Sequence, residues 1–584
     1  MGADNAGLLA EQDSSKITPI LDALNLLGST PWKINKPMLD QVIECFTNQS
    51  QYADFIDDLS IPRHRDTCML NEPKALSSVL MGKVNAGGFR NLGDDEQDTY
   101  STFQVEKSAF NKWKNECYSL WSDAKKRLSI ANHFKDHVLY FPHNIDFRGR
   151  VYPLTPHFNH MGADLARSLL VFAEGKKLGP RGLYWLKLHA INLTGTMKRD
   201  SVEDRISHAD EIMDDIVDSA RNPFGGRRWW LQSDDPWQTL ATCIEIKNAM
   251  DSGDPENFIS HLPVHQDGSC NGLQHYAALG RDVLGAGAVN LLPAEKPQDI
   301  YSEVAEIVDR RRREDAANGV AVASVLEGFV RRKVIKQTVM TTVYGVTAYG
   351  ARQQIARQLK DIEDFPAASV DEASKYLADK TFQSLNELFQ ASQEIQAWLT
   401  DCAVFLSKEM QECVQWETPL GFAVRQPYPR KGASVWSSTA DVDNRSRVYA
   451  FTPMTVRMGM KPNTVRNANG FPPNFVHSLD SSHMMMTALE LWSRGITYAS
   501  VHDCYWTHAC SVEDMNEVCR EQFINLHSFP VVEKLAEAFQ ERLREAGDSL
   551  SIVDQHKAEV LFKMVPKKGK LDLGEVKKSV YFFS

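Results

Sequence analysis

The stretch that constrains the fold most is a carboxylate followed by a glycine turn, and it reads Val264-His265-Gln266-Asp267-Gly268-Ser269-Cys270-Asn271-Gly272-Leu273-Gln274-His275-Tyr276. Leu279 and Val283 continue it at helical spacing. The pattern predicts a strand that delivers Asp267, a tight turn at Gly268, and then a helix. Most Asp-Gly pairs are ordinary turns, so this one is weak evidence when taken alone. A carboxylate at a strand end beside an exposed glycine carbonyl does, however, offer the hard oxygen ligands that Mg²⁺ prefers.

A second stretch contains another carboxylate between β-forming residues, and it reads Ile496-Thr497-Tyr498-Ala499-Ser500-Val501-His502-Asp503-Cys504-Tyr505-Trp506-Thr507-His508. The composition predicts a hairpin with Asp503 at its tip. An ordinary turn residue is the simpler interpretation of Asp503 alone, but a buried Asp is costly unless it is paired or binds a metal. Together, Asp267 and Asp503 could chelate two Mg²⁺ ions about 3.5–4 Å apart.

A third stretch, residues 332–345, begins with cations and ends with an aromatic residue. Arg332, Lys336, Met340 and Tyr344 are four apart, so on a helix they form one ridge that turns by about 40° per step. This order suits a nucleoside triphosphate, with phosphates at the cations and base and sugar at Tyr344. A core stripe of Met and Tyr with flanking cations explains the spacing equally well.

The charge distribution supports an anion-binding role for this region. The 584-residue chain has a formal net charge of −11, which argues mildly against nonspecific coating of nucleic acid. Its composition, with 43% hydrophobic residues, is that of a globular protein and excludes wholesale disorder. Between Gly328 and Lys360, however, there are seven basic residues and no acidic one. A solvated helical face is the alternative to an anion site.

Cysteine spacing and hydropathy exclude several classes of protein. The ten cysteines include no CxxC pair and no zinc-site spacing, which favours reduced thiols in an intracellular compartment. No apolar run approaches 18 residues, so no membrane span is expected. Residues 1–6 resemble neither a secretory signal nor a transit peptide.

Taken together, the three stretches resemble the catalytic region of the phage-type single-subunit RNA polymerases, including the mitochondrial members. Residues 267–275 look like motif A of that family, residues 332–345 like motif B, and His502-Asp503 like motif C. Other matches occur in family order from about residue 30 to the last residue: Asp146-Phe147-Arg148-Gly149-Arg150-Val151-Tyr152, Gln298-Asp299-Ile300-Tyr301, Pro473-Asn474-Phe475-Val476-His477-Ser478 and Tyr581-Phe582-Phe583-Ser584.

The resemblance implies an α+β fold that is predominantly α, shaped as a right hand with an antiparallel palm sheet. The implied divisions are a remnant of an N-terminal region at 1–61, a thumb at 62–140, palm at 141–295 and 478–584, and fingers at 296–477. Mitochondrial members carry a long N-terminal extension and a promoter-reading domain. Because the match begins almost at Met1, we expect neither in this polypeptide.

The implied function is that of a DNA-directed RNA polymerase, which transfers ribonucleotides to an RNA 3′ end by two-metal-ion catalysis and transcribes the mitochondrial genome. The implied cofactor is a pair of Mg²⁺ ions. The implied partners are a DNA template, nascent RNA, ribonucleoside triphosphates, and mitochondrial initiation and elongation factors. We expect a monomer in the mitochondrial matrix, at the nucleoid.

The site residues implied by the resemblance fall into three groups. Catalysis is assigned to Asp267, Asp503 and Lys336, with both carboxylates and the Gly268 carbonyl as metal ligands. The implied nucleotide contacts are Arg332, Lys336, Tyr344, Tyr301, His477 and Gly272. The implied template or nucleic-acid contacts are Arg148, Arg150 and Gly345, although a structural ion pair suits the two arginines as well. His502 is interpreted as a structural or primer-end residue.

A DNA polymerase of the same architecture is the rival enzyme. Related DNA polymerases place a bulky Glu five residues after the metal-binding Asp, where it fills the space of a 2′-hydroxyl. Here that residue is Gly272, and Tyr344 offers a hydroxyl to the sugar, so the sequence favours ribonucleotides. A catalytically dead relative that only binds nucleic acid or a partner is a third reading. The presence of Asp267, Asp503 and Lys336 argues against it.

Overall fold

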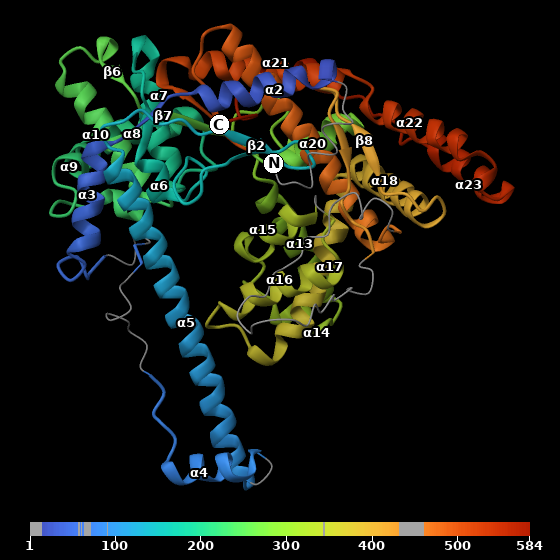
Figure 1. The fold of residues 1–584 in the computed structure, drawn as a ribbon, viewed down its shortest axis with the longest axis horizontal. Helices are drawn as coiled ribbons and strands as arrows, with labels where there is room; N and C mark the ends of the chain where they lie inside the picture. Colours follow the sequence, from blue (N-terminus) through green and yellow to red (C-terminus); the bar gives the residue numbers. More distant parts are fainter. Residues whose placement is uncertain are drawn as a thin grey trace, which may run out of the picture.

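The computed structural model describes residues 14–55, 59, 61–62, 72–89, 92–342, 345–430 and 461–584. These parts of the chain are mostly helical, with small sheets whose strands all pair antiparallel (Figure 1). The predicted fold class, α+β with predominant helix, is confirmed. The division into palm, fingers and thumb remains a prediction.

A three-stranded sheet unites the two predicted carboxylate segments. It contains β7 (Pro263–Asp267), β10 (Ala499–Val501) and β11 (Cys504–His508), in the order β10-β11-β7. Val501 lies opposite Cys504 across the hairpin, which leaves His502 and Asp503 as a two-residue turn. The predicted hairpin with Asp503 at its tip is therefore confirmed.

This sheet lies between two hydrophobic cores. Successive side chains of a strand point to opposite faces, so Tyr505 packs into one core and Trp506 into the other. The second core also buries Trp32, Trp230 and Trp237. Its surrounding elements are β1 (Trp32–Ile34), α3 (Lys36–Thr47), α6 (Asp164–Ser168), β4 (Leu170–Phe172), α7 (Gly179–Thr194), α8 (Val202–Glu211), α9 (Met213–Arg221) and α10 (Pro236–Asp251). Because β1 pairs with β4, the N-terminal segment is part of this core.

The helix predicted after Asp267 is α11 (Asn271–Gly280), and α12 (Val283–Ala288) follows it. All the residues of α11 are buried, because it packs against α18 (Gln390–Lys408) and α20 (Thr464–Ser493). The strand, turn and helix predicted from residues 264–280 are thus confirmed. On its other side, α20 packs against α2 (Ser14–Ser29) and α21 (Val512–Ser528).

A helical group carries the cationic segment. It comprises α13 (Ile300–Ala317), α14 (Ala321–Val325), α15 (Arg332–Thr342), α16 (Ala348–Lys360) and α17 (Val370–Leu388), which lie together below the sheet in Figure 1. The buried face of α15 consists of Val334, Ile335, Thr338, Val339 and Thr342. Met340 is exposed, so its ridge with Arg332 and Lys336 is not the core stripe that the spacing also allowed.

One long helix projects from the body of the molecule. It is α5 (Asp94–His133), and α4 (Ser78–Gly87) lies at its far end (Figure 1). Only Ala124, Leu128 and Ala131 of α5 are buried, so most of this helix makes no core contact. The remaining elements are β2 (His143–Ile145), β3 (Val151–Pro153), β5 (Lys176–Lys177), β6 (Ile259–Ser260), β8 (Gln415–Glu417), β9 (Ala423–Arg425), α22 (Val531–Ala546) and α23 (Ile552–Lys563). Among the described helices, none combines the length and apolar character needed to cross a membrane.

Candidate active site

Asp267 and Asp503 come together at one end of the sheet. Asp267 is the last residue of β7 and lies opposite Cys504, the residue that follows Asp503. Desolvation raises the pKa of Asp503, and repulsion from Asp267 and Asp480 raises it further. Although solvent reaches the Asp267 side chain, surrounding protein desolvates its carboxyl group and raises its pKa as well. The site therefore concentrates negative charge that the nearby protein only partly compensates.

The turn that carries Asp503 has an unusual backbone. His502 has a φ of +57°, a left-handed conformation that is uncommon for residues other than glycine and that suits a two-residue hairpin turn. Its ring packs edge-on against Tyr152, with the centroids 5.0 Å apart. Burial lowers the pKa of His502, which favours the neutral ring. Whether His502 has a structural or a primer-end role stays a prediction.

The C-terminal residues support the turn after Asp267. The Ser584 N–H donates to the Asp267 carbonyl at 3.1 Å, and Ser269 Oγ donates to the Tyr581 carbonyl at 3.1 Å. A Cβ at Gly268 would lie 3.3 Å from Gln274 Oε1 and 3.5 Å from the Phe583 ring. The turn is thus packed closely against the end of the chain, a contact that the sequence alone did not reveal.

Tyr301 links the cations of α15 to the residues after Asp267. The Arg332 guanidinium lies 5.2 Å from the centre of the Tyr301 ring, and Lys336 Nζ lies 5.7 Å from it. The hydroxyl of the buried Tyr301 is hydrogen-bonded with the Cys270 thiol. Arg332 is also fixed by Asp299, with 2.7 Å between Nε and Oδ2. This arrangement places both cations beside the motif A turn.

Lys336 is the less neutralised of the two cations. Among the described residues it has no ion-pair partner, whereas Arg332 has Asp299. Burial lowers the pKa of Lys336, and the positive charges of Arg332 and Lys198 lower it further. Lys198 also lowers the pKa of Asp267, so it lies near both the carboxylates at the sheet end and the cations of α15. The sequence analysis did not identify Lys198, because nothing local distinguishes it from other surface lysines.

The loop at residues 146–150 packs its arginines against α20. Asp146 accepts hydrogen bonds from the backbone N–H groups of Arg148 at 2.8 Å and Arg150 at 3.1 Å. Arg148 Nη1 lies 2.9 Å from His477 Nδ1, and Arg150 pairs with Asp480 at 2.7 Å. Burial lowers the pKa of His477 to about 3, so the ring is neutral and its Nδ1 accepts from the arginine. For the two arginines, nucleic-acid contact and a structural ion pair were equally open predictions, and in the structure their head groups make internal ion pairs and hydrogen bonds.

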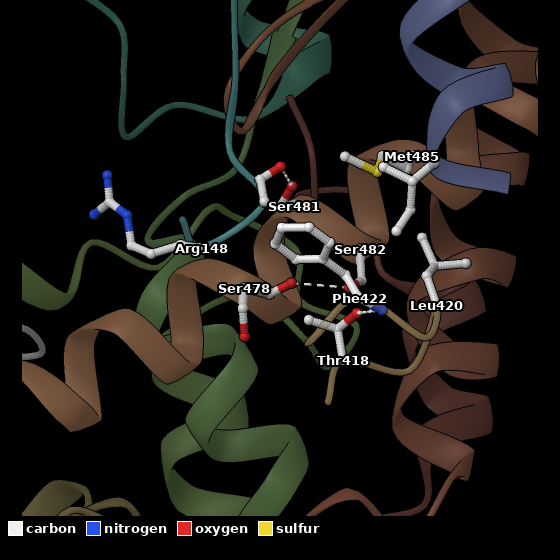
Figure 2. Close-up of a pocket in the computed structure, with 10 residues that line it drawn as sticks. Arg148, Thr418, Leu420, Phe422, Ser478, Ser481, Ser482 and Met485 are labelled. Atoms are coloured by element: carbon white, nitrogen blue, oxygen red, sulfur yellow. Dashed lines mark hydrogen bonds between the residues drawn. The ribbon is translucent and has the colours of Figure 1, made fainter. Parts of the chain in front are cut away.

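Behind this loop is a small cavity, shown in Figure 2. Its lining includes Arg148, Gly149, Phe422, Ser478 and Ser481. Its volume is about 10 Å³, which is room for about one water molecule. The hydroxyl groups of Ser478 and Ser481 donate to backbone carbonyls. The cavity is therefore too small to be the nucleotide site.

Comparison with known proteins agrees with this geometry. A family model described as DNA-dependent RNA polymerase matches residues 176–560. The chain belongs to that family. The mitochondrial DNA-directed RNA polymerase of Mus musculus is 47% identical over 582 residues, which are 99% of this chain and 46% of that protein. The Homo sapiens counterpart is 47% identical over 97% of this chain and 44% of its own length.

More distant relatives extend the comparison. The chloroplastic/mitochondrial DNA-directed RNA polymerase 2B of Nicotiana tabacum is 42% identical over 98% of this chain and 52% of its own length. The chain thus spans about half the length of the curated relatives it matches. A solved structure, the POL domain of Pol1 from M. smegmatis in complex with DNA primer-template and dNTP, aligns with a TM-score of 0.39 and 14% identity. That alignment covers 91% of this chain and 69% of the Pol1 chain.

The residues of this DNA-dependent RNA polymerase family member fit a divalent cation at the sheet end. Two carboxylates converge there, and within the described chain neither one forms an ion pair. Burial raises the pKa of both carboxyl groups, and repulsion from Asp267 adds to the shift at Asp503, so a bound cation would stabilise their charged forms. No cluster of three or more acidic, His or Cys ligands was found among the described residues. Any metal would therefore need backbone, substrate or water oxygens beside Asp267 and Asp503.

The predicted sugar-reading residues are placed only in part. Gly272 is buried in the first turn of α11, and His477 is held by Arg148. Tyr344 lies outside the described residues. Gly345, which follows it, is exposed and has a φ of +69° that favours glycine. The structural basis of ribose selection by this polymerase family member therefore stays a prediction.

Proposed function

We propose that this chain catalyses template-directed addition of ribonucleotides to an RNA 3′ end, as a mitochondrial DNA-directed RNA polymerase. The observation that carries the proposal is the placement of Asp267 beside Asp503 with the cations of α15 nearby. Anionic metal ligands and a cationic phosphate site are what nucleotidyl transfer requires. The family membership and the two mitochondrial relatives at 47% identity support the same reaction.

Metal binding is assigned to the sheet end. Asp267, Asp503 and the Gly268 carbonyl would hold two Mg²⁺ ions, with water and substrate oxygens completing their coordination. When bound, such ions lower the pKa of the attacking 3′-hydroxyl and offset charge on the pyrophosphate leaving group. The support of Gly268 by the C-terminal residues would keep its carbonyl in place for this purpose.

Triphosphate binding is assigned to the cationic side of the site. Lys336 has no ion-pair partner within the described part of the chain and would neutralise charge that develops on the phosphates. Its lowered pKa also makes it a better proton donor to the leaving pyrophosphate. Arg332 is held by Asp299 and would bind the phosphates in a fixed orientation, and Lys198 extends the positive field. Tyr301 would position both cations through the contacts that they make with its ring.

Sugar and template recognition are assigned to the remaining predicted residues. Tyr344 and the open edge at Gly272 would accept the ribose 2′-hydroxyl, with His477 supporting that group. Gly345 is retained as a template contact because it is exposed and follows the C-terminal end of α15. Arg148 and Arg150 would act on nucleic acid mainly by shaping the loop at residues 146–150, since their head groups are engaged internally.

The division into thumb, palm and fingers is part of this proposal, with α5 as the main thumb helix. The same holds for transcription of the mitochondrial genome and for the partners. These are a DNA template, nascent RNA, ribonucleoside triphosphates and mitochondrial transcription factors, acting on a monomeric polymerase.

The test is single-nucleotide extension of an RNA primer annealed to a DNA template, with and without Mg²⁺. Incorporation of the templated ribonucleotide, and much weaker use of the matched deoxynucleotide, is the expected result. Preference for deoxynucleotides would make the chain a DNA polymerase. Scaffold binding without extension would make it a binding protein only.

A further inference from the structure

Asp480 is a buried carboxylate that the proposed reaction does not use. It lies on α20, and its side chain is 4% exposed. One oxygen, Oδ2, accepts hydrogen bonds from Arg150 Nε at 3.1 Å and Nη2 at 2.7 Å. The other, Oδ1, accepts from Asn271 Nδ2 at 2.7 Å. A single carboxylate therefore joins three segments that are far apart in the sequence.

The charge of Asp480 is maintained despite its burial. Desolvation is the largest single influence and opposes ionisation, but the charge and hydrogen bonds of Arg150, with smaller contributions from His275 and His477, together hold the pKa of Asp480 below its ordinary value. A buried charge of this kind is strongly destabilising when its partner is removed. The Arg150–Asp480 pair is therefore needed for stability, and both carboxylate oxygens of Asp480 accept hydrogen bonds.

Asn271 connects this carboxylate to the metal site. It is the first residue of α11 and ends the turn that begins after Asp267. The C-terminal residues hold the same turn through the hydrogen bond from Ser269 Oγ to the Tyr581 carbonyl. At the end of the turn, Asn271 Nδ2 donates to Asp480 Oδ1 at 2.7 Å. The turn is therefore fixed from two sides.

We propose that Asp480 is a positioning residue of the metal site, which fixes the Asp267 turn through Asn271 and ties it to the 146–150 loop through Arg150. The inference rests on the proposed function only for the identity of the metal ligands. Groups that orient metal ligands without touching the metal commonly change metal affinity or activity by about 10–100-fold when they are replaced.

Two variants of the full chain test this role. Asp480→Asn offers one acceptor oxygen in place of two, so either Arg150 or Asn271 loses its contact. Asn271→Ala removes only the contact to the turn and leaves the Arg150–Asp480 pair in place. The measurement is a Mn²⁺ titration followed by electron paramagnetic resonance, alongside the half-saturating Mg²⁺ concentration for primer extension and the thermal unfolding curve.

The matched control is Asp309→Asn. Asp309 pairs with the buried Arg312 at 2.6 Å and with Arg313 at 3.1 Å on α13, so the variant likewise replaces a carboxylate that pairs with a buried arginine. We expect Asp480→Asn and Asn271→Ala to weaken Mn²⁺ binding by about tenfold. The half-saturating Mg²⁺ concentration for primer extension should rise by a similar factor. Asp309→Asn should lower the unfolding temperature and leave the Mn²⁺ affinity and the half-saturating Mg²⁺ concentration unchanged.

The results separate this inference from the proposed function. If wild-type chain neither binds Mn²⁺ nor extends a primer, the proposed function fails. If wild-type chain does both and Asn271→Ala binds Mn²⁺ with wild-type affinity, the positioning role of Asp480 is overturned. An equal loss of Mn²⁺ affinity in Asp309→Asn would overturn it too, because general destabilisation would then explain the data.

Discussion

Asp503 immediately precedes the residue that lies opposite Asp267 in the β7–β11 ladder, and burial followed by repulsion from Asp267 raises the pKa of Asp503. Two carboxylates from distant parts of the chain are thus held close together by backbone pairing. Folding therefore brings two negative charges together where water only partly solvates them, and a bound cation would stabilise this arrangement. This relationship leads to the first two predictions.

Asp267→Asn and Asp503→Asn should each abolish primer extension while leaving scaffold binding within a few-fold of wild type. The carboxylates act on the chemistry through the metal, whereas affinity for nucleic acid depends on basic side chains. Extension rates and scaffold dissociation constants measured on the same preparations check this. Near-normal extension by either variant would end the assignment of metal ligands.

Asp503→Asn should also stabilise the metal-free chain at neutral pH. A carboxyl group whose pKa is raised on folding binds its proton more tightly in the native state. Stability is therefore lost as the pH rises from the ordinary Asp value of about 3.9 through the raised native value. Asp267, Asp480 and Arg150 are the charged groups that act on it, and the repulsive pair dominates over the arginine.

Removing that charge should raise the unfolding temperature by about 2 °C or more at pH 7.5 in EDTA. The difference should shrink as the pH approaches 4. Thermal denaturation of both proteins across this range is the measurement. A lower unfolding temperature for Asp503→Asn at pH 7.5 would show that the carboxylate is compensated in the native state.

Lys336→Ala should reduce the extension rate by more than about tenfold, because preorganised electrostatic donors are commonly worth several kcal/mol. Arg332→Ala should chiefly raise the apparent KM for the nucleotide. Lys375→Ala, at an exposed position on α17, is the control for loss of a positive charge. If Lys375→Ala lost as much activity, the effect would not be specific to the nucleotide site.

Tyr344→Phe should lower the preference for ribonucleotides over deoxynucleotides. The change removes a hydroxyl and keeps the ring, so the loss should match a hydrogen bond of about 1–3 kcal/mol, or about five- to 150-fold in the ratio of kcat/KM values. Gly272→Glu should lower the same ratio by filling the ribose edge. Single-nucleotide extension with matched substrates measures both. An unchanged ratio in Tyr344→Phe would mean that the sugar is read elsewhere.

Local sequence patterns predicted the elements of the site well. The β-forming residues on either side of His502 and Asp503 predicted the hairpin, and the Asp-Gly turn before a periodic apolar run predicted β7 followed by α11. The four-residue spacing of Arg332 and Lys336 predicted their common ridge on α15. These features depend on backbone propensity and side-chain periodicity within one element, which a short stretch of sequence contains in full.

The sequence by itself therefore determined the fold class, the motifs and the carboxylates that carry the proposed chemistry. Only the tertiary structure decided which charges meet. Arg150 pairs with Asp480, and Asp480 with Asn271, although these residues belong to three distant segments. The approach of Lys198 to Lys336 and the packing of Ser584 against Asp267 are of the same kind. Such contacts arise because burial forces each charge and hydrogen-bonding group to find a partner, and long-range packing rather than local spacing determines which partner is within reach.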